Sequence, residues 1–132
     1  SVEALSLLDV ETTLLPGKTL TRVSATHGPS GAPITGYEIH LGQTAGPDCA
    51  RPFALIGEEP DGAISADGRV MGTYIHGCFA GDQFRRSFLA TLGAEAGSLA
   101  FDVEIERTLD ELAAHLESHL DLDRILALAG PV

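Results

Sequence analysis

Residues 70–92 read VMGTYIHGCFAGDQFRRSFLATL, and the hydrophobic pattern changes within this stretch. Up to His76 the side chains are rich in β-branched and aromatic groups, which is typical of a strand. From residue 83 onward the apolar residues fall at helical spacing, which is typical of a helix with one buried face. They are Phe84, Phe88, Leu89 and Leu92. The stretch therefore predicts one crossing from strand to helix.

The residues before this crossing predict strands. We expect a short strand at Leu7–Leu15, a turn at Pro16-Gly17, and a second strand at Lys18–Thr26. A third strand is expected at Ile34–Leu41. Because side chains alternate along a strand, its residues divide between two faces. Gly36, Glu38 and His40 share one face, and Tyr37, Ile39 and Leu41 share the other.

A β-meander is expected over residues 53–76, and it should bring His76 to one edge of the sheet. Pro60-Asp61-Gly62 and Asp67-Gly68 both predict turns, because Asp-Gly between apolar runs favours a tight hairpin. Asp61 and Asp67 are accordingly interpreted as turn residues.

The last third of the chain predicts helices at residues 83–92, 104–120 and 123–129. Asp82 is the expected N-cap of the first helix and Gly93 its stop. Asp121 or Asp123 is the expected cap of the last helix, which should end near Gly130-Pro131. With strands over residues 7–76 followed by helices, the expected fold class is α/β.

Composition limits the classes of function. The 132 residues include 8 Lys+Arg and 19 Asp+Glu, a formal net charge of −11. This charge argues against binding to nucleic acid or to an anionic membrane surface. No apolar run is long enough to span a membrane, and no signal segment opens the sequence. Two cysteines, Cys49 and Cys78, make no disulfide framework, so a cytoplasmic location is expected.

His76 is the residue best placed for chemistry. It lies at the end of a predicted strand, before Gly77 and a short loop into a helix, and reactive groups in α/β proteins gather at the carboxyl ends of strands. Gly72 and Gly77 would allow close approach of a substrate or another backbone. From the residues alone, a single histidine at the end of a strand is more often structural or merely exposed than catalytic.

Three segments carry a resemblance to a known family. GTYIHGCF (Gly72–Phe79) resembles the histidine motif of the glutamine amidotransferases of the cobyric acid synthase family, relatives of the class I (triad) amidotransferases. GYEIHLG (Gly36–Gly42) and LLDVETTL (Leu7–Leu14) resemble two further motifs of that family, and RRSFL fits the usual continuation. Their order and spacing match from Val2 to about Ala127, nearer to cobyric acid synthases than to cobyrinic acid a,c-diamide synthases.

The resemblance implies a partial flavodoxin-like fold and a defined chemistry. In this family a cysteine attacks the carboxamide of glutamine, ammonia is released, and water hydrolyses the glutamyl thioester. The ammonia passes to an ATP-dependent synthetase domain, which amidates the b, d, e and g carboxylates of adenosylcobyrinic acid a,c-diamide in cobalamin biosynthesis. His76 matches the catalytic histidine, which would take the thiol proton, protonate the ammonia and then activate water.

The resemblance also implies a missing nucleophile. The family places its cysteine on a glycine-rich elbow upstream of LLDVETTL, before Ser1. Cys49 lies in a loop after Pro47-Asp48, and Cys78 lies two residues from His76, on the same side of an extended chain but without an elbow. We therefore expect residues 1–132 to be the C-terminal segment of an amidotransferase domain, inactive alone and open to self-association. ATP and Mg are expected in the synthetase domain, since this segment has no phosphate loop.

The other candidate side chains carry weaker signals. Class I triads place Glu two residues after the histidine, where this sequence has Cys78, so Glu38 is our candidate for the orienting carboxylate. The alternative for Glu38 is a strand carboxylate held by a neighbouring group. His115 and His119 have the spacing of a helical metal pair, but a solvated helix face explains them too, so no metal is expected. His27 lies in a loop without an obvious partner.

The expected activity is thus glutamine-dependent amidation, with glutamine as one partner and the corrinoid bound by the synthetase domain. A related amidotransferase with another acceptor, such as a cell-wall peptide carboxylate, is the alternative within enzymes. A non-catalytic α/β scaffold module is the alternative outside them.

Overall fold

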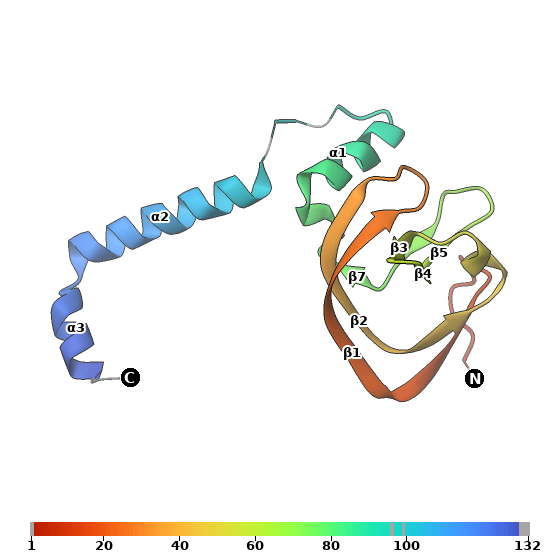
Figure 1. The fold of residues 1–132 in the computed structure, drawn as a ribbon, viewed down its shortest axis with the longest axis horizontal. Helices are drawn as coiled ribbons and strands as arrows, with labels where there is room; N and C mark the ends of the chain where they lie inside the picture. Colours follow the sequence, from red (N-terminus) through yellow and green to blue (C-terminus); the bar gives the residue numbers. More distant parts are fainter. Residues whose placement is uncertain (1, 96, 99, 130–132) are drawn as a thin grey trace. The chain divides into compact units, whose positions relative to one another are not determined.

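The computed structural model describes residues 2–95, 97–98 and 100–129. It divides into two compact units, Ser1–Gly97 and Ser98–Val132. The first unit contains the strands and one α-helix, and the second contains two further helices (Figure 1). The α/β class expected from the sequence is confirmed, with strands preceding helices along the chain.

The main sheet has five strands in the order β4-β3-β1-β2-β7, and the described pairings are antiparallel. These strands are β1 (Glu11–His27), β2 (Pro33–Ala45), β3 (Ala54–Ile56), β4 (Glu59–Asp61) and β7 (Ile75–His76). A separate hairpin pairs β5 (Ala63–Ile64) with β6 (Met71–Gly72). The helical elements are η1 (Pro47–Ala50), η2 (Cys78–Ala80), α1 (Asp82–Thr91), α2 (Phe101–His119) and α3 (Leu122–Ala129).

Strands β1 and β2 dominate the first unit and curve side by side over most of their length (Figure 1). The expected turn at Pro16-Gly17 is wrong, because β1 continues through it. Between the pairs Leu14↔Gly42 and Thr19↔His40 the register shifts. The extra residues form an irregularity that accommodates a proline without an N–H to donate. The start of the expected strand is also wrong, since Leu7–Asp9 is bent and β1 begins at Glu11.

Residues 53–76 do not form a simple meander. β3 and β4 lie at one edge of the main sheet, β5 and β6 form their own hairpin, and β7 joins β2 at the opposite edge. The expected Asp67-Gly68 turn is confirmed: Gly68 has φ 71°, and Asp67 Oδ1 accepts from the Ser65 hydroxyl at 2.7 Å. His76 does reach a sheet edge, but by crossing from one edge of the sheet to the other.

The core lies on the inner face of the sheet, under α1. Alternate residues of β1 and β2 are buried there, in keeping with the two-residue period of a strand. The buried cluster includes Val23, Ala25, Ile34, Phe53, Ile75, Cys78 and Phe84. Phe84, the largest fully buried side chain, comes from α1 and fixes this helix to the sheet.

Of the two helix ends predicted for α1, the N-terminal one is wrong and the C-terminal one is confirmed. Gly81, not Asp82, is the N-cap of α1; Asp82 lies in its first turn, where it accepts from Arg85 Nη2 at 2.5 Å. Gly93 is the expected stop: it has φ 73°, and the Ala94 N–H bonds back to Leu89 O at 3.0 Å.

In the second unit, Asp121 caps α3 by accepting from the Arg124 N–H at 3.0 Å. α2 begins at Phe101, three residues before the expected start, and ends at His119. The expected last-helix end at Gly130-Pro131 lies outside the described residues.

Strand β7 approaches β2 closely at Gly36. A Cβ atom at this position would lie 2.4 Å from the backbone oxygen of His76 and 2.8 Å from Cγ2 of Ile75. Neither distance is compatible with packing, so β7 can pair at its observed position only because residue 36 has no side chain.

We predict that Gly36→Ala lowers the free energy of unfolding by about 1–3 kcal/mol, the typical cost of overpacking. Urea unfolding of the wild type and the variant measures it. Gly17→Ala is the matched control, since a Cβ there has no neighbour within 4 Å, and its effect should be small. Equal stabilities of the two variants would contradict the close approach of β7.

His27 is a buried histidine in the aromatic part of the core. Its ring centroid lies 5.0 Å from that of Phe53 and 5.1 Å from that of Phe84. Nδ1 lies 2.7 Å from the Ser30 hydroxyl, and Nε2 is buried without a partner among the described residues. Burial therefore lowers the pKa of His27 from its ordinary 6.5.

We predict that His27 makes the fold less stable in mild acid. The folded state holds the neutral ring, whereas the unfolded chain takes up a proton near pH 6.5. Stability is therefore fully present above that pH and falls as the pH is lowered below it. Urea unfolding across this range should show a smaller acid loss in His27→Leu than in the wild type, while His115→Gln on α2 should behave as the wild type does. An unchanged pH dependence in His27→Leu would refute this role.

Candidate functional site

His76 lies on β7 at the edge of the main sheet, and its side chain is exposed. It pairs with Tyr37 on β2, so the two side chains share the outer face of the sheet. No hydrogen bond joins the imidazole of His76 to another residue in the part of the chain that the structure describes. The ring is therefore accessible from the outer face.

Glu38 lies on the other face. It pairs with Ile75, a core residue, so the alternation of β2 and β7 directs Glu38 inward and His76 outward. Its Oε1 lies 3.1 Å from Nε2 of His40. The structure therefore brings Glu38 to His40, and does not bring it to His76.

His40 is held on three sides. Its Nδ1 donates to the backbone oxygen of Gly42 at 2.7 Å, and its Nε2 faces Glu38. Its ring stacks on that of Tyr74, with the centroids 4.7 Å apart. Both ring nitrogens thus face oxygen atoms, and the stacked ring of Tyr74 fixes the orientation of the imidazole.

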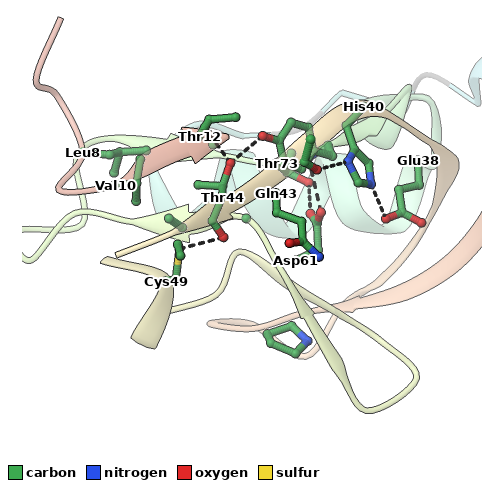
Figure 2. Close-up of a pocket in the computed structure, with 17 residues that line it drawn as sticks. Leu8, Val10, Thr12, Glu38, His40, Gln43, Thr44, Cys49, Asp61 and Thr73 are labelled. Atoms are coloured by element: carbon green, nitrogen blue, oxygen red, sulfur yellow. Dashed lines mark hydrogen bonds and ion pairs between the residues drawn. The ribbon is translucent and has the colours of Figure 1, made fainter. Parts of the chain in front are cut away.

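Glu38 and His40 line a pocket of about 560 Å³ on the inner side of the sheet (Figure 2). One wall is apolar and includes Leu8, Val10, Pro60 and Ala63. The polar lining consists of Thr12, Glu38, His40, Gln43, Thr44, Asp61, Thr73 and Tyr74. His76 is not among the lining residues, so this pocket and the exposed imidazole are separate features.

Asp61 is the buried carboxylate of this pocket. The chain does bend directly after it, at Gly62 with φ 74°, but Asp61 itself belongs to a strand and does more than form the turn. It ends β4 and is 6% exposed. Its Oδ2 accepts from the Thr73 hydroxyl, and its Oδ1 accepts from the Tyr74 N–H at 3.4 Å. Burial raises the pKa of Asp61, and these two hydrogen bonds oppose the rise. The sequence Pro-Asp-Gly gave no sign of this role, because it is equally typical of a turn.

The hydroxyl groups of the pocket are bonded to one another. The Tyr74 hydroxyl lies 2.5 Å from Oγ1 of Thr44, which lies 2.7 Å from Oγ1 of Thr12. Thr44 and Asp61 thus have hydrogen-bond partners at residues 73 and 74, directly before β7.

The two thiols are placed poorly for nucleophilic attack. Cys78 is buried, and burial raises the pKa of its thiol. Gly77 takes a left-handed conformation with φ 76°, so the chain turns after His76, and the expectation that His76 and Cys78 point to the same side is wrong. Cys49 lines the pocket, with Sγ 3.9 Å from the backbone oxygen of Thr44.

The remaining candidates are explained by local contacts. The rings of His115 and His119 stack with centroids 4.2 Å apart, and Nδ1 of His119 donates to the backbone oxygen of His115 at 2.8 Å. Within residues 2–95, 97–98 and 100–129, no three His, Cys, Asp or Glu side chains gather closely enough to hold a metal ion. In the same residues no helix has the length and apolarity needed to cross a membrane.

Curated proteins with similar sequences are cobyric acid synthases. That of Cereibacter sphaeroides is 60% identical over 127 residues, that of Jannaschia sp. 55% over 124, and that of Bradyrhizobium diazoefficiens 54% over 125. These matches cover 96%, 94% and 95% of this chain but 26% of each relative. The chain thus spans about a quarter of the length of the relatives it matches.

No solved structure matches this chain. The family model for the CobB/CobQ-like glutamine amidotransferase domain matches residues 1–84, which include the strands β1–β7 described above, His76 and the first residues of α1. A partial flavodoxin-like domain is consistent with this match and with the mixed α/β architecture. The chain belongs to the CobB/CobQ-like glutamine amidotransferase domain family.

Proposed function

We propose that the full-length protein amidates adenosylcobyrinic acid a,c-diamide to cobyric acid with nitrogen from glutamine, as a step of cobalamin biosynthesis. The observation that carries this proposal is the 54–60% identity to cobyric acid synthases along nearly all of the chain. The family match supports the glutamine-dependent part of the reaction. The choice of adenosylcobyrinic acid a,c-diamide as the acceptor of the nitrogen rests on the similarity to cobyric acid synthases.

His76 is the acid–base group of the proposed glutaminase site. Its imidazole takes the proton of a cysteine thiol as sulfur attacks the carboxamide carbon of glutamine. The same proton then goes to the departing ammonia, which leaves a glutamyl thioester. Finally the ring takes a proton from water, and the attack of that water gives glutamate and restores the thiol. An exposed imidazole at a sheet edge, with no competing hydrogen bond among the described residues, suits this exchange of protons.

The attacking thiol is proposed to come from a part of the full-length protein other than these residues. Cys78 is buried with a raised pKa, and Cys49 lies in the pocket that His76 does not line. A nucleophilic cysteine needs to be accessible and close to its base. Cys78 is buried, and Cys49 does not share a pocket with His76. ATP, Mg and the corrinoid are likewise proposed to bind elsewhere in the full-length protein.

The role of Glu38 as the orienting carboxylate gains no support from the geometry. Its carboxylate is paired with His40 on the inner face, whereas the imidazole of His76 lies on the outer face. The arrangement instead supports the alternative, a strand carboxylate held by a neighbour.

The outer face supports one further part of the proposal. Within the first unit, Leu20, Tyr37 and Leu41 are 62%, 49% and 50% exposed on it. A soluble domain rarely leaves such a face uncovered. We therefore propose that residues 1–132 self-associate when separated from the rest of the protein.

We predict that His76→Ala in the full-length protein lowers kcat for glutamine hydrolysis by about 10²–10⁴-fold, the usual contribution of a general acid–base group. Synthesis of cobyric acid from added ammonia should persist, because ammonia bypasses the glutaminase site. His119→Ala, on the exposed face of α2, is the control and should hydrolyse glutamine at the wild-type rate. A near-normal rate of glutamine hydrolysis by His76→Ala would contradict the proposed function and favour a non-catalytic scaffold role.

A further inference from the structure

We propose that Asp61 is a positioning residue for His76, acting through Thr73 and Tyr74. This inference rests on the proposed function of His76. Strand β7, which carries His76, has few contacts within the sheet. Another group is therefore needed to hold the imidazole in place.

Strand β7 has little support of its own. It consists of Ile75 and His76, and its register with β2 is limited to the pairs Tyr37↔His76 and Glu38↔Ile75. One more backbone bond, from the Ile39 N–H to Tyr74 O at 3.1 Å, precedes them. An edge strand of two residues is too short to fix its own position. The segment before it must therefore be held by other groups.

The carboxylate of Asp61 supplies that support. Its Oδ2 accepts from the Thr73 hydroxyl and its Oδ1 from the Tyr74 N–H. The Thr73 hydroxyl oxygen in turn accepts from the Ile75 N–H at 3.0 Å. One side chain thus reaches, directly or through one hydroxyl, the three residues that precede His76.

Hydrogen bonds to a carboxylate are stronger than those between neutral groups, and these are shielded from water. Asp61 is buried, and Figure 2 shows its carboxylate directed at Thr73, with the paired Glu38 and His40 nearby. Burial of a carboxylate is costly unless its oxygens are bonded. The two bonds to residues 73 and 74 meet that condition and at the same time fix the backbone.

The topology makes this contact a link between opposite edges of the sheet. Asp61 ends β4 at one edge, and Thr73 leads into β7 at the other. Without it, β7 would depend on its two-pair ladder with β2, on the buried side chain of Ile75 and on the contacts of Tyr74 with β2. Because misplacement of a catalytic group by about 1 Å can lower a rate about 10²-fold, loss of Asp61 should affect turnover more than substrate binding.

The experiment compares four variants of the full-length protein in glutamine hydrolysis. Asp61→Asn weakens the acceptor, Thr73→Val removes the hydroxyl at nearly constant shape, and Thr73→Ser restores the hydroxyl. Asp67→Asn is the matched control: it also precedes a glycine and also bonds a hydroxyl and a backbone N–H, but in an exposed turn. Ammonia-dependent synthesis is measured in parallel as a test of the folded state.

We expect kcat to fall at least about tenfold in Asp61→Asn and in Thr73→Val, with the KM for glutamine changed less than about threefold. Thr73→Ser should recover most of the kcat, Asp67→Asn should match the wild type, and all four should retain ammonia-dependent synthesis. If Asp61→Asn does not fold, the comparison of Thr73→Val with Thr73→Ser decides the matter.

Wild-type kcat in Thr73→Val, or equal losses in Thr73→Val and Thr73→Ser, would overturn the positioning role. If His76→Ala is inactive in that case, the proposed function stands and only the inference about Asp61 fails. If His76→Ala remains active, both fail together.

Discussion

The pairing of a two-residue strand, β7, with β2 controls the position of His76, the proposed acid–base group. β7 fits against β2 because Gly36 leaves room for the backbone of His76. It is held there by the carboxylate of Asp61, bonded to Thr73 and Tyr74. The close fit at Gly36 and the hydrogen bonds to Asp61 both act on residues 73–76. Both are needed because β7 pairs with β2 through two residue pairs.

The same sheet separates two environments. Its inner face carries the core at one end, around Ile34 and Phe84, and the polar pocket at the other, around Glu38 and His40. Its outer face carries His76. The pocket groups are bonded mostly to one another, so they stabilise the backbone that leads into β7. The imidazole of His76 is exposed on the opposite face, as the proposed role in proton transfer requires.

This division explains which features the sequence could predict. The β-branched alternation of β2 placed Glu38 and His40 on one face, and both line the pocket. Local turn and cap chemistry predicted the Asp67-Gly68 hairpin and the stop at Gly93, because those signals depend on neighbouring residues. The strand-end position of His76 was also readable from the change of hydrophobic period.

The role of Asp61 could not be read in the same way. Its partners lie twelve and thirteen residues along the chain, and its burial arises from the crossing of the segment between the sheet edges. The continuation of β1 through Pro16-Gly17 depends likewise on a partner strand that the local sequence does not reveal. At Pro16-Gly17 the pairing with β2 overrode the local turn signal, whereas at Gly62 the chain does bend and the local signal missed only the contacts of Asp61.

Hydrogen–deuterium exchange of residues 73–76 measures whether the buried carboxylate of Asp61 holds the backbone that leads into β7. If Asp61 holds β7, the backbone amides of Tyr74 and Ile75 are protected in the full-length wild type, because they donate to Asp61 and to Thr73. In Asp61→Asn these amides should exchange faster, while the amides of α1 keep their wild-type rates. Identical exchange of residues 73–76 in the two proteins would contradict the claim that the buried carboxylate holds β7.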